Sequence, residues 1–176
     1  MREILELVPY DPKWPGEFDR ERRRLADRLG VRAIRIDHHG STAVPGLAAK
    51  PIIDIQISIT PLHPLDATIA ALDDLGYVHV PHPDDAFCPF FHRPAEWPHT
   101  HHVHAVEAGG LEERRTLAFR DYLHRNPVVA REYEQLKRQL AARHNAGELD
   151  SYPGGKTGFV ECVIRTALAN GYPLDL

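Results

Sequence analysis

The chain has 176 residues, of which 43% are hydrophobic, and this length is enough for one domain with a full apolar core. Its formal net charge of −4 argues against a general nucleic-acid binder, because such proteins normally carry a basic excess. We recognise no membrane span or signal peptide, and Cys88 and Cys162 are far apart and resemble ordinary reduced thiols, so a cytoplasmic protein is expected.

The first third of the chain predicts one helix between short strands. Residues 3–8 alternate well enough for a short strand. Residues 13–29 place their large apolar side chains on one helical stripe, and Gly30 follows as a natural end. Residues 33–37 form a further strand. Residues 51–59 are a nearly continuous β-branched run, which is typical of a central strand buried on both faces.

The middle third predicts more strands. A helix is expected over 64–75, followed by strands at 77–80, 86–91 and 100–107. The last of these, THHVHAVE, alternates cleanly, so that His102 and His104 share one face.

After residue 107 the composition favours helices. Three are expected, the first two separated at Asn126-Pro127 and the last preceded by a loop over 147–155. We therefore predict a single domain over 1–176, with an α/β core at 1–107 and C-terminal helices at 108–176 that pack on it.

Gly40 and Ser41 precede Asp54, an acid within the buried strand. Backbone N–H groups and a hydroxyl in a tight turn can bind phosphate oxygens, and an acid on the next strand can hold a divalent metal against them. The alternative is a β-turn beside a structural aspartate that is hydrogen-bonded to backbone amides. The pattern alone weighs these readings about evenly.

His102 and His104 could share a metal ion with Asp54, because two histidines on one strand face and a neighbouring carboxylate are a suitable ligand set. A pair of half-buried or surface histidines is the more common meaning of an HxH pattern.

Two basic residues are further candidates for phosphate binding. Lys156 lies in GGKTG, which lacks the first glycine of a P-loop but could place the lysine at a helix start; a solvated lysine is about as probable an interpretation. Arg120 could bind phosphate with two hydrogen bonds, although a structural ion pair is the stronger expectation.

The chain contains, in order, YDPKWPGEF, HHGSTAVPGLAAKPIIDIQI, HHVHAV and FRDYL, then Tyr133 with Lys137 and finally Tyr152, Lys156 and Phe159. This succession resembles the GrpB family of uncharacterised proteins, also called UPF0157, over nearly the whole chain. The resemblance implies an α/β (α+β) fold with a nucleotidyltransferase-like mixed β-sheet flanked by helices and a C-terminal helical annex.

In that superfamily a Gly-Ser turn precedes two acids on the next strand, and a third acid follows on a later strand; together they hold two metals around a nucleoside triphosphate. Here Gly40 and Ser41 match the turn and Asp54 matches the first acid, but Gln56 stands at the second position and the HxH histidines at the third. An amide and imidazoles suit one softer ion, such as Zn²⁺ or Mn²⁺, better than two Mg²⁺ ions.

The leading hypothesis is a protein that binds a nucleotide or other phosphorylated small molecule with a divalent metal (Mg, Mn or Zn) and, if catalytic, transfers a nucleotidyl or phosphoryl group. The residues assigned are Asp54 and Ser41 for catalysis; Gly40, Ser41, Thr42, Lys50, Arg120 and Lys156 for phosphate; and Asp54, His102 and His104 for metal. No nucleic acid or membrane is expected as a partner, and the oligomeric state is open.

Two alternatives remain. One is a non-catalytic ligand-binding or folding-accessory module, since the family also occurs fused to a coenzyme A biosynthetic kinase. The weaker one is a mononuclear His/Asp metal hydrolase that uses a bound water.

Overall fold

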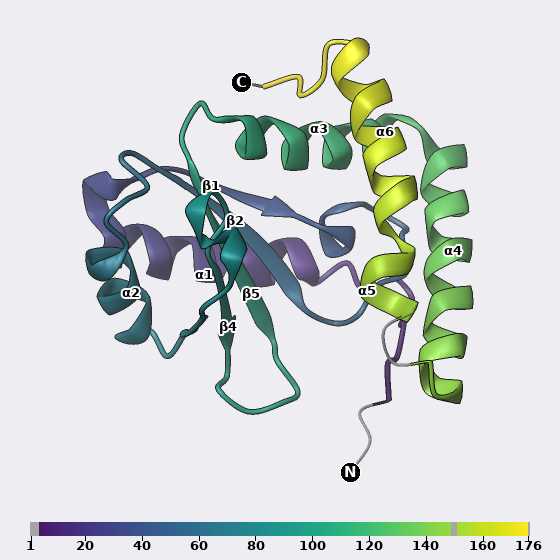
Figure 1. Ribbon diagram of the computed structural model, residues 1–176, viewed down its shortest axis with the longest axis horizontal. Coiled ribbons are helices and arrows are strands. Elements are labelled where there is room, and N and C mark those ends of the chain that lie inside the picture. The colour runs from purple at the N-terminus through teal and green to yellow at the C-terminus, as the bar shows by residue number, and fades with distance from the viewer. Residues whose placement is uncertain (1–3, 149–150, 176) are drawn as a thin grey trace.

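The structure is a computed structural model that describes residues 4–148 and 151–175. A five-stranded sheet lies at its centre, with the strand order β1-β2-β5-β4-β3 (Figure 1). The strands are β1 (Ala33–His39), β2 (Ile53–Ile59), β3 (Val78–Val80), β4 (Phe90–Arg93) and β5 (His101–Glu107). β5 is parallel to β2, whereas the other neighbouring strands are antiparallel. The predicted mixed sheet flanked by helices is confirmed.

Strand β2 lies between β1 and β5 and has one apolar and one polar face. Its four isoleucines, at positions 53, 55, 57 and 59, are each no more than 2% exposed and belong to the main apolar core. Asp54, Gln56 and Ser58 point to the opposite face, because successive side chains of a strand alternate. Gln56 and Ser58 are also fully buried, which confirms a central strand covered on both faces.

Two helices cover the apolar face of the sheet. Helix α1 (Trp14–Leu29) contributes Trp14, Leu25 and Leu29 to the core, and helix α2 (Asp66–Asp73) contributes Leu72. The apolar stripe of α1 faces the sheet because burial of that stripe is the main free-energy gain available to an amphipathic helix.

The remaining helices are α3 (Leu111–Arg125), α4 (Pro127–Ala146), α5 (Ser151–Gly155) and α6 (Thr157–Ala169). Helix α3 lies against the polar face of the sheet, where Thr116 contacts Gln56. Helices α4 and α6 stand side by side at the end of the molecule opposite α2 (Figure 1), and a stacked pair of rings, Tyr133 and Phe159, joins them. The assignment of all these parts to one domain stays a prediction.

Helix α5 falls within the segment that was predicted to be a loop. Its two terminal glycines disfavour a helix by propensity. However, Gly155 packs closely on α4: a Cβ at this position would lie 3.0 Å from Cδ1 of Leu140 and closer still to Cδ2. Tertiary packing on α4 therefore decides the conformation of this segment.

Two predicted strands also differ from the structure. In place of a strand over 3–8, the described part has a single antiparallel bridge between Val8 and Ala49. The strand predicted at 86–91 begins only at Phe90, because a 3₁₀ turn, Pro83–Ala86, precedes it. The ring nitrogen of His82 accepts a hydrogen bond from the Asp84 amide and stabilises the start of that turn.

Within residues 4–148 and 151–175, no helix combines the length and apolar character needed to cross a membrane.

Candidate functional site

A cavity of about 270 Å³ opens on the polar face of the sheet, beside the turn that follows β1. Strands β2 and β5 supply its floor, and α3, α4 and the α5–α6 segment supply its walls. Its lining residues are Gly40, Ser41, Ala49, Lys50, Ile52, Asp54, His102, Phe119, Tyr133, Lys137, Tyr152 and Lys156.

Gly40 brings the turn directly against Asp54. Its φ of 68° lies in the left-handed region, which glycine adopts without steric cost. A Cβ at this position would lie 2.8 Å from Cβ of Asp54, so any larger residue would collide with the acid. The absence of a side chain therefore lets the Ser41 hydroxyl and the Asp54 carboxylate line the same small cavity.

Asp54 is ionised at neutral pH. Burial alone would raise the pKa of its carboxyl. The hydrogen bond from His102 and the neighbouring imidazoles outweigh that effect and lower the pKa to about 2. Nδ1 of His102 lies 3.4 Å from Oδ1 of Asp54, since the two residues are direct partners across the parallel β2–β5 pair. The carboxylate keeps 27% of its side-chain surface exposed and so remains available to a ligand.

Three of the four lysines in the sequence line this cavity: Lys50, Lys137 and Lys156. The ammonium groups of Lys50 and Lys156 lie over the ring of Tyr152, at 5.0 and 4.3 Å from its centroid. Burial lowers the pKa of Lys156, and the proximity of Lys50 lowers it further. Among the lining residues the lysines outnumber the single acid, Asp54. The cavity therefore favours an anionic ligand.

Lys137 is the most deeply buried of the three, with 1% of its surface exposed. Its ammonium lies 2.9 Å from the hydroxyl of Ser41, donates to the carbonyl of Ala48 and lies 4.9 Å from the centroid of the Tyr133 ring. Burial lowers the pKa of Lys137 to about 7, and the nearby Lys156 contributes in the same direction. A large share of this side chain is therefore neutral near physiological pH.

Aromatic side chains form the remaining wall of the cavity. Phe119 of α3 packs edge-on against Tyr133 of α4 at 5.3 Å, and Tyr133 stacks on Phe159 of α6. Apolar contacts between these three helices therefore fix the position of the wall relative to the sheet.

Six of the predicted site residues meet in the cavity: Gly40, Ser41, Lys50, Asp54, His102 and Lys156. Thr42 does not line it. Its side chain is buried behind the turn, where it contacts Nε2 of His38 and donates to the carbonyl of Ile52.

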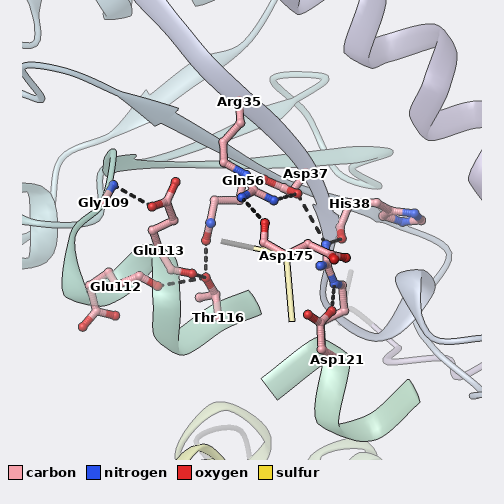
Figure 2. Close-up of polar contacts among 11 residues, drawn as sticks. Arg35, Asp37, His38, Gln56, Gly109, Glu112, Glu113, Thr116, Asp121 and Asp175 are labelled. Carbon is pink, nitrogen blue, oxygen red and sulfur yellow. Dashed lines mark hydrogen bonds and ion pairs between the residues drawn. The ribbon is translucent and has the colours of Figure 1, made fainter. Parts of the chain in front are cut away.

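Arg120 also lies outside the cavity lining. Its guanidinium contacts Asp121 at 2.7 Å and Asp37 at 3.5 Å and donates to the carbonyl of His38. Figure 2 labels Asp37, Asp121 and His38, the three residues that this guanidinium contacts. These contacts match the structural ion pair that the sequence favoured for this arginine.

His104 shares a strand face with His102 but contacts other groups. Its Nδ1 lies 3.6 Å from Sγ of Cys88, and its ring packs edge-on against His39. Burial lowers the pKa of His104 to about 4, so the imidazole is neutral at physiological pH. Across the described ranges, no group of three or more His, Cys, Asp or Glu side chains is arranged to hold one metal ion. The metal set of Asp54, His102 and His104 stays a prediction.

Gln56, at the position where the superfamily carries a second acid, is covered by α3. Its Oε1 accepts a hydrogen bond from the hydroxyl of Thr116, whose other acceptors are the carbonyls of Glu112 and Glu113 (Figure 2). Within the described residues its Nε2 has no partner. The side chain is fully buried and is absent from the lining of the cavity.

No site role was predicted for four residues of this lining: Phe119, Tyr133, Lys137 and Tyr152. One signal for Lys137 was present: it lies between Leu136 and Leu140 on the apolar stripe of its helix, where a lysine is costly without a specific partner.

The family described as "GrpB protein" matches residues 4–166. A UPF0157 protein of Halalkalibacterium halodurans is 36% identical, over 94% of this chain and 83% of the relative. The crystal structure of the conserved protein GrpB from Enterococcus faecalis superimposes with a TM-score of 0.84 at 32% identity and covers 94% of this chain and 98% of that one. A dephospho-CoA kinase of Mycolicibacterium paratuberculosis is 33% identical over 94% of this chain, which spans 46% of that protein.

Proposed function

This chain belongs to the GrpB family, and we propose that its cavity binds a phosphorylated small molecule, with a nucleotide as the first candidate. The observation that carries the proposal is the convergence of Lys50, Lys137 and Lys156 on one cavity beside the Gly40–Ser41 turn. The ammonium groups of Lys50 and Lys156, next to hydroxyl and backbone donors, are a suitable environment for phosphate oxygens.

The size of the cavity limits what it can enclose. About 270 Å³ lies just below the range that surrounds a whole drug-sized ligand. We infer that the cavity takes the phosphate groups and that the rest of the molecule extends toward the aromatic wall at Tyr133 and Phe119. Aromatic rings there would provide a stacking surface for a planar group.

A divalent ion is part of the proposal only together with the ligand. Asp54 and His102 would supply two ligands to it, and phosphate oxygens would have to supply the others, because His104 contacts Cys88 and His39 instead. Such an ion would neutralise charge on the phosphates. If the protein is catalytic, we propose nucleotidyl or phosphoryl transfer that depends on positioning and electrostatics, as expected for a nucleotidyltransferase-like fold.

A second candidate is a non-catalytic binding module. It is favoured by Gln56, which stands where the superfamily carries its second acid. This neutral side chain is buried and hydrogen-bonded to Thr116. The match to proteins named dephospho-CoA kinase is compatible with both candidates. In each of these proteins a segment similar to this chain makes up 46% of the length.

Isothermal titration calorimetry with ATP and with inorganic pyrophosphate, each with Mg²⁺ and with EDTA, tests the binding. We expect binding by the wild type and an affinity loss of about 10-fold or more in Lys156→Met, since a hydrogen bond to a charged group contributes about 1.5–3 kcal/mol. Lys13→Met is the matched control, because Lys13 is the fourth lysine and is exposed at the start of α1. Equal affinity in Lys156→Met and Lys13→Met would contradict the proposal, as would the absence of heat with both anions.

If Asp54 holds a divalent ion against the ligand, Asp54→Ala should bind the anion with the same affinity in Mg²⁺ and in EDTA. Unchanged Mg²⁺ dependence in this variant would remove the ion from the proposal and leave the lysines as the phosphate ligands.

A further inference from the structure

Ser41 and Lys137 are an unusual pair among the described residues. The serine is half-buried in the turn after β1 and lines the cavity, whereas the lysine lies on α4 and is 1% exposed. Their Oγ and Nζ atoms are 2.9 Å apart. One partner is therefore accessible to a ligand, and the other is shielded from water.

The surroundings of Lys137 favour its neutral form. No carboxylate of the described residues forms an ion pair with it, and its contacts are the Ala48 carbonyl, the Ser41 hydroxyl and the Tyr133 ring. A buried ammonium with neutral partners alone loses more solvation than it regains. A neutral amine can instead donate to the Ala48 carbonyl and accept the Ser41 hydroxyl proton through its lone pair.

A hydroxyl that is hydrogen-bonded to a buried neutral amine is an activated nucleophile, by the same logic as other pairs of a nucleophile and an adjacent base. We propose that Ser41 is a nucleophile, that Lys137 is its general base, and that the pair accepts a phosphoryl group from a phosphoanhydride bound in the cavity.

The step is balanced without a further reactant. The Ser41 hydroxyl proton moves to Nζ of Lys137, and Oγ forms a bond to phosphorus. The phosphorus–oxygen bond to the leaving phosphate breaks, and its electron pair stays on that phosphate. The products are a phosphoserine, an ammonium on Lys137 and the shortened anion. The inference rests on the proposed function, because the donor has to be bound in the same cavity.

A short-chain alkyl fluorophosphonate tests the nucleophile without the natural ligand, because the serine displaces fluoride from phosphorus. We expect one adduct per chain by intact-mass spectrometry, mapped to Ser41 by peptide sequencing and absent in Ser41→Ala. The labelling rate of Lys137→Met should fall by about 100-fold or more, since general-base catalysis contributes at least about that factor. Lys137→Arg should be equally slow, because a guanidinium keeps the charge and cannot take a proton. Lys13→Met should label like the wild type.

The pH dependence of wild-type labelling gives a readout that does not depend on the folding of any variant. The rate should rise with pH through about 7, where burial and Lys156 place the pKa of Lys137, and then level off. The charged groups that face this ammonium are Lys156 from the start of α6, Asp54 from β2, and Glu134 and Arg138 from α4.

No adduct on the wild type at pH 9 would overturn the inference, as would an adduct on another residue or equal labelling of Lys137→Arg. Calorimetry on the same samples separates the two proposals. Nucleotide binding without labelling rejects the nucleophile alone, and labelling without nucleotide binding rejects the proposed ligand alone.

Discussion

Ser41 and Lys137 are 96 positions apart in the sequence, yet both line the same cavity, with the hydroxyl oxygen of one and the amine nitrogen of the other 2.9 Å apart. This contact joins the turn after β1 to the middle of α4. It also gives a buried lysine a neutral partner, which has consequences for stability as well as for chemistry.

The free energy of unfolding should rise with pH above neutrality because of Lys137. Its pKa is about 7 in the folded protein, whereas the ordinary value is 10.5, so between these values the unfolded chain binds more protons. Stability therefore increases over this window, by at most about 1.4 kcal/mol per pH unit from this group. Urea unfolding at pH 7, 8 and 9 measures the slope, and Lys137→Met should have a shallower one. Parallel curves for the two proteins would show that the lysine is protonated in the folded state.

Gly40→Ala should destabilise the fold more than Gly46→Ala. Both glycines have a positive φ, of 68° and 79°, so both variants carry backbone strain. An added Cβ at position 40 collides with Asp54, whereas one at position 46 has no neighbour within 4 Å. We expect an additional loss of about 1–3 kcal/mol for Gly40→Ala, which is the usual cost of overpacking. Urea denaturation of the two variants checks this, and equal losses would mean that the turn can move away from Asp54.

Restoring the second acid with Gln56→Glu should destabilise the protein and add no metal affinity, because α3 covers the position. A buried carboxylate with a single hydroxyl donor costs several kcal/mol, and the cost should shrink at acidic pH as the group takes a proton. Thermal unfolding at pH 5 and pH 8 measures both effects. Gln135→Glu on the exposed face of α4 is the control and should be close to neutral. A stable Gln56→Glu variant that binds Mn²⁺ would contradict this account.

The family comparison supports the fold more strongly than the chemistry. A match over residues 4–166 and a TM-score of 0.84 to a solved GrpB structure fix the arrangement of the sheet and helices. What the cavity binds depends on particular side chains, and these are the ones that the variants above replace.

Local sequence determined much of the framework. The β-branched run around Asp54 predicted the central strand, because such side chains fill both faces of a covered sheet, and the apolar stripe before Gly30 predicted α1. The glycine and serine of the turn and the acid of the next strand were recognised as neighbours, since one short loop joins them. By contrast, two short elements with little local preference were predicted wrongly, because tertiary packing sets their limits: β4 was expected at 86–91, and α5 was expected to be a loop.

The sequence by itself therefore determined the mixed sheet, the Gly40–Ser41 turn and the position of Asp54 beside it. Only the tertiary structure decided which distant side chains complete the site. It buried Gln56 under α3, turned Arg120 toward Asp37 and Asp121, and brought Lys137 to Ser41. The physical reason is that these contacts depend on how the helices pack on the sheet, and that packing is set by apolar surfaces spread along the whole chain.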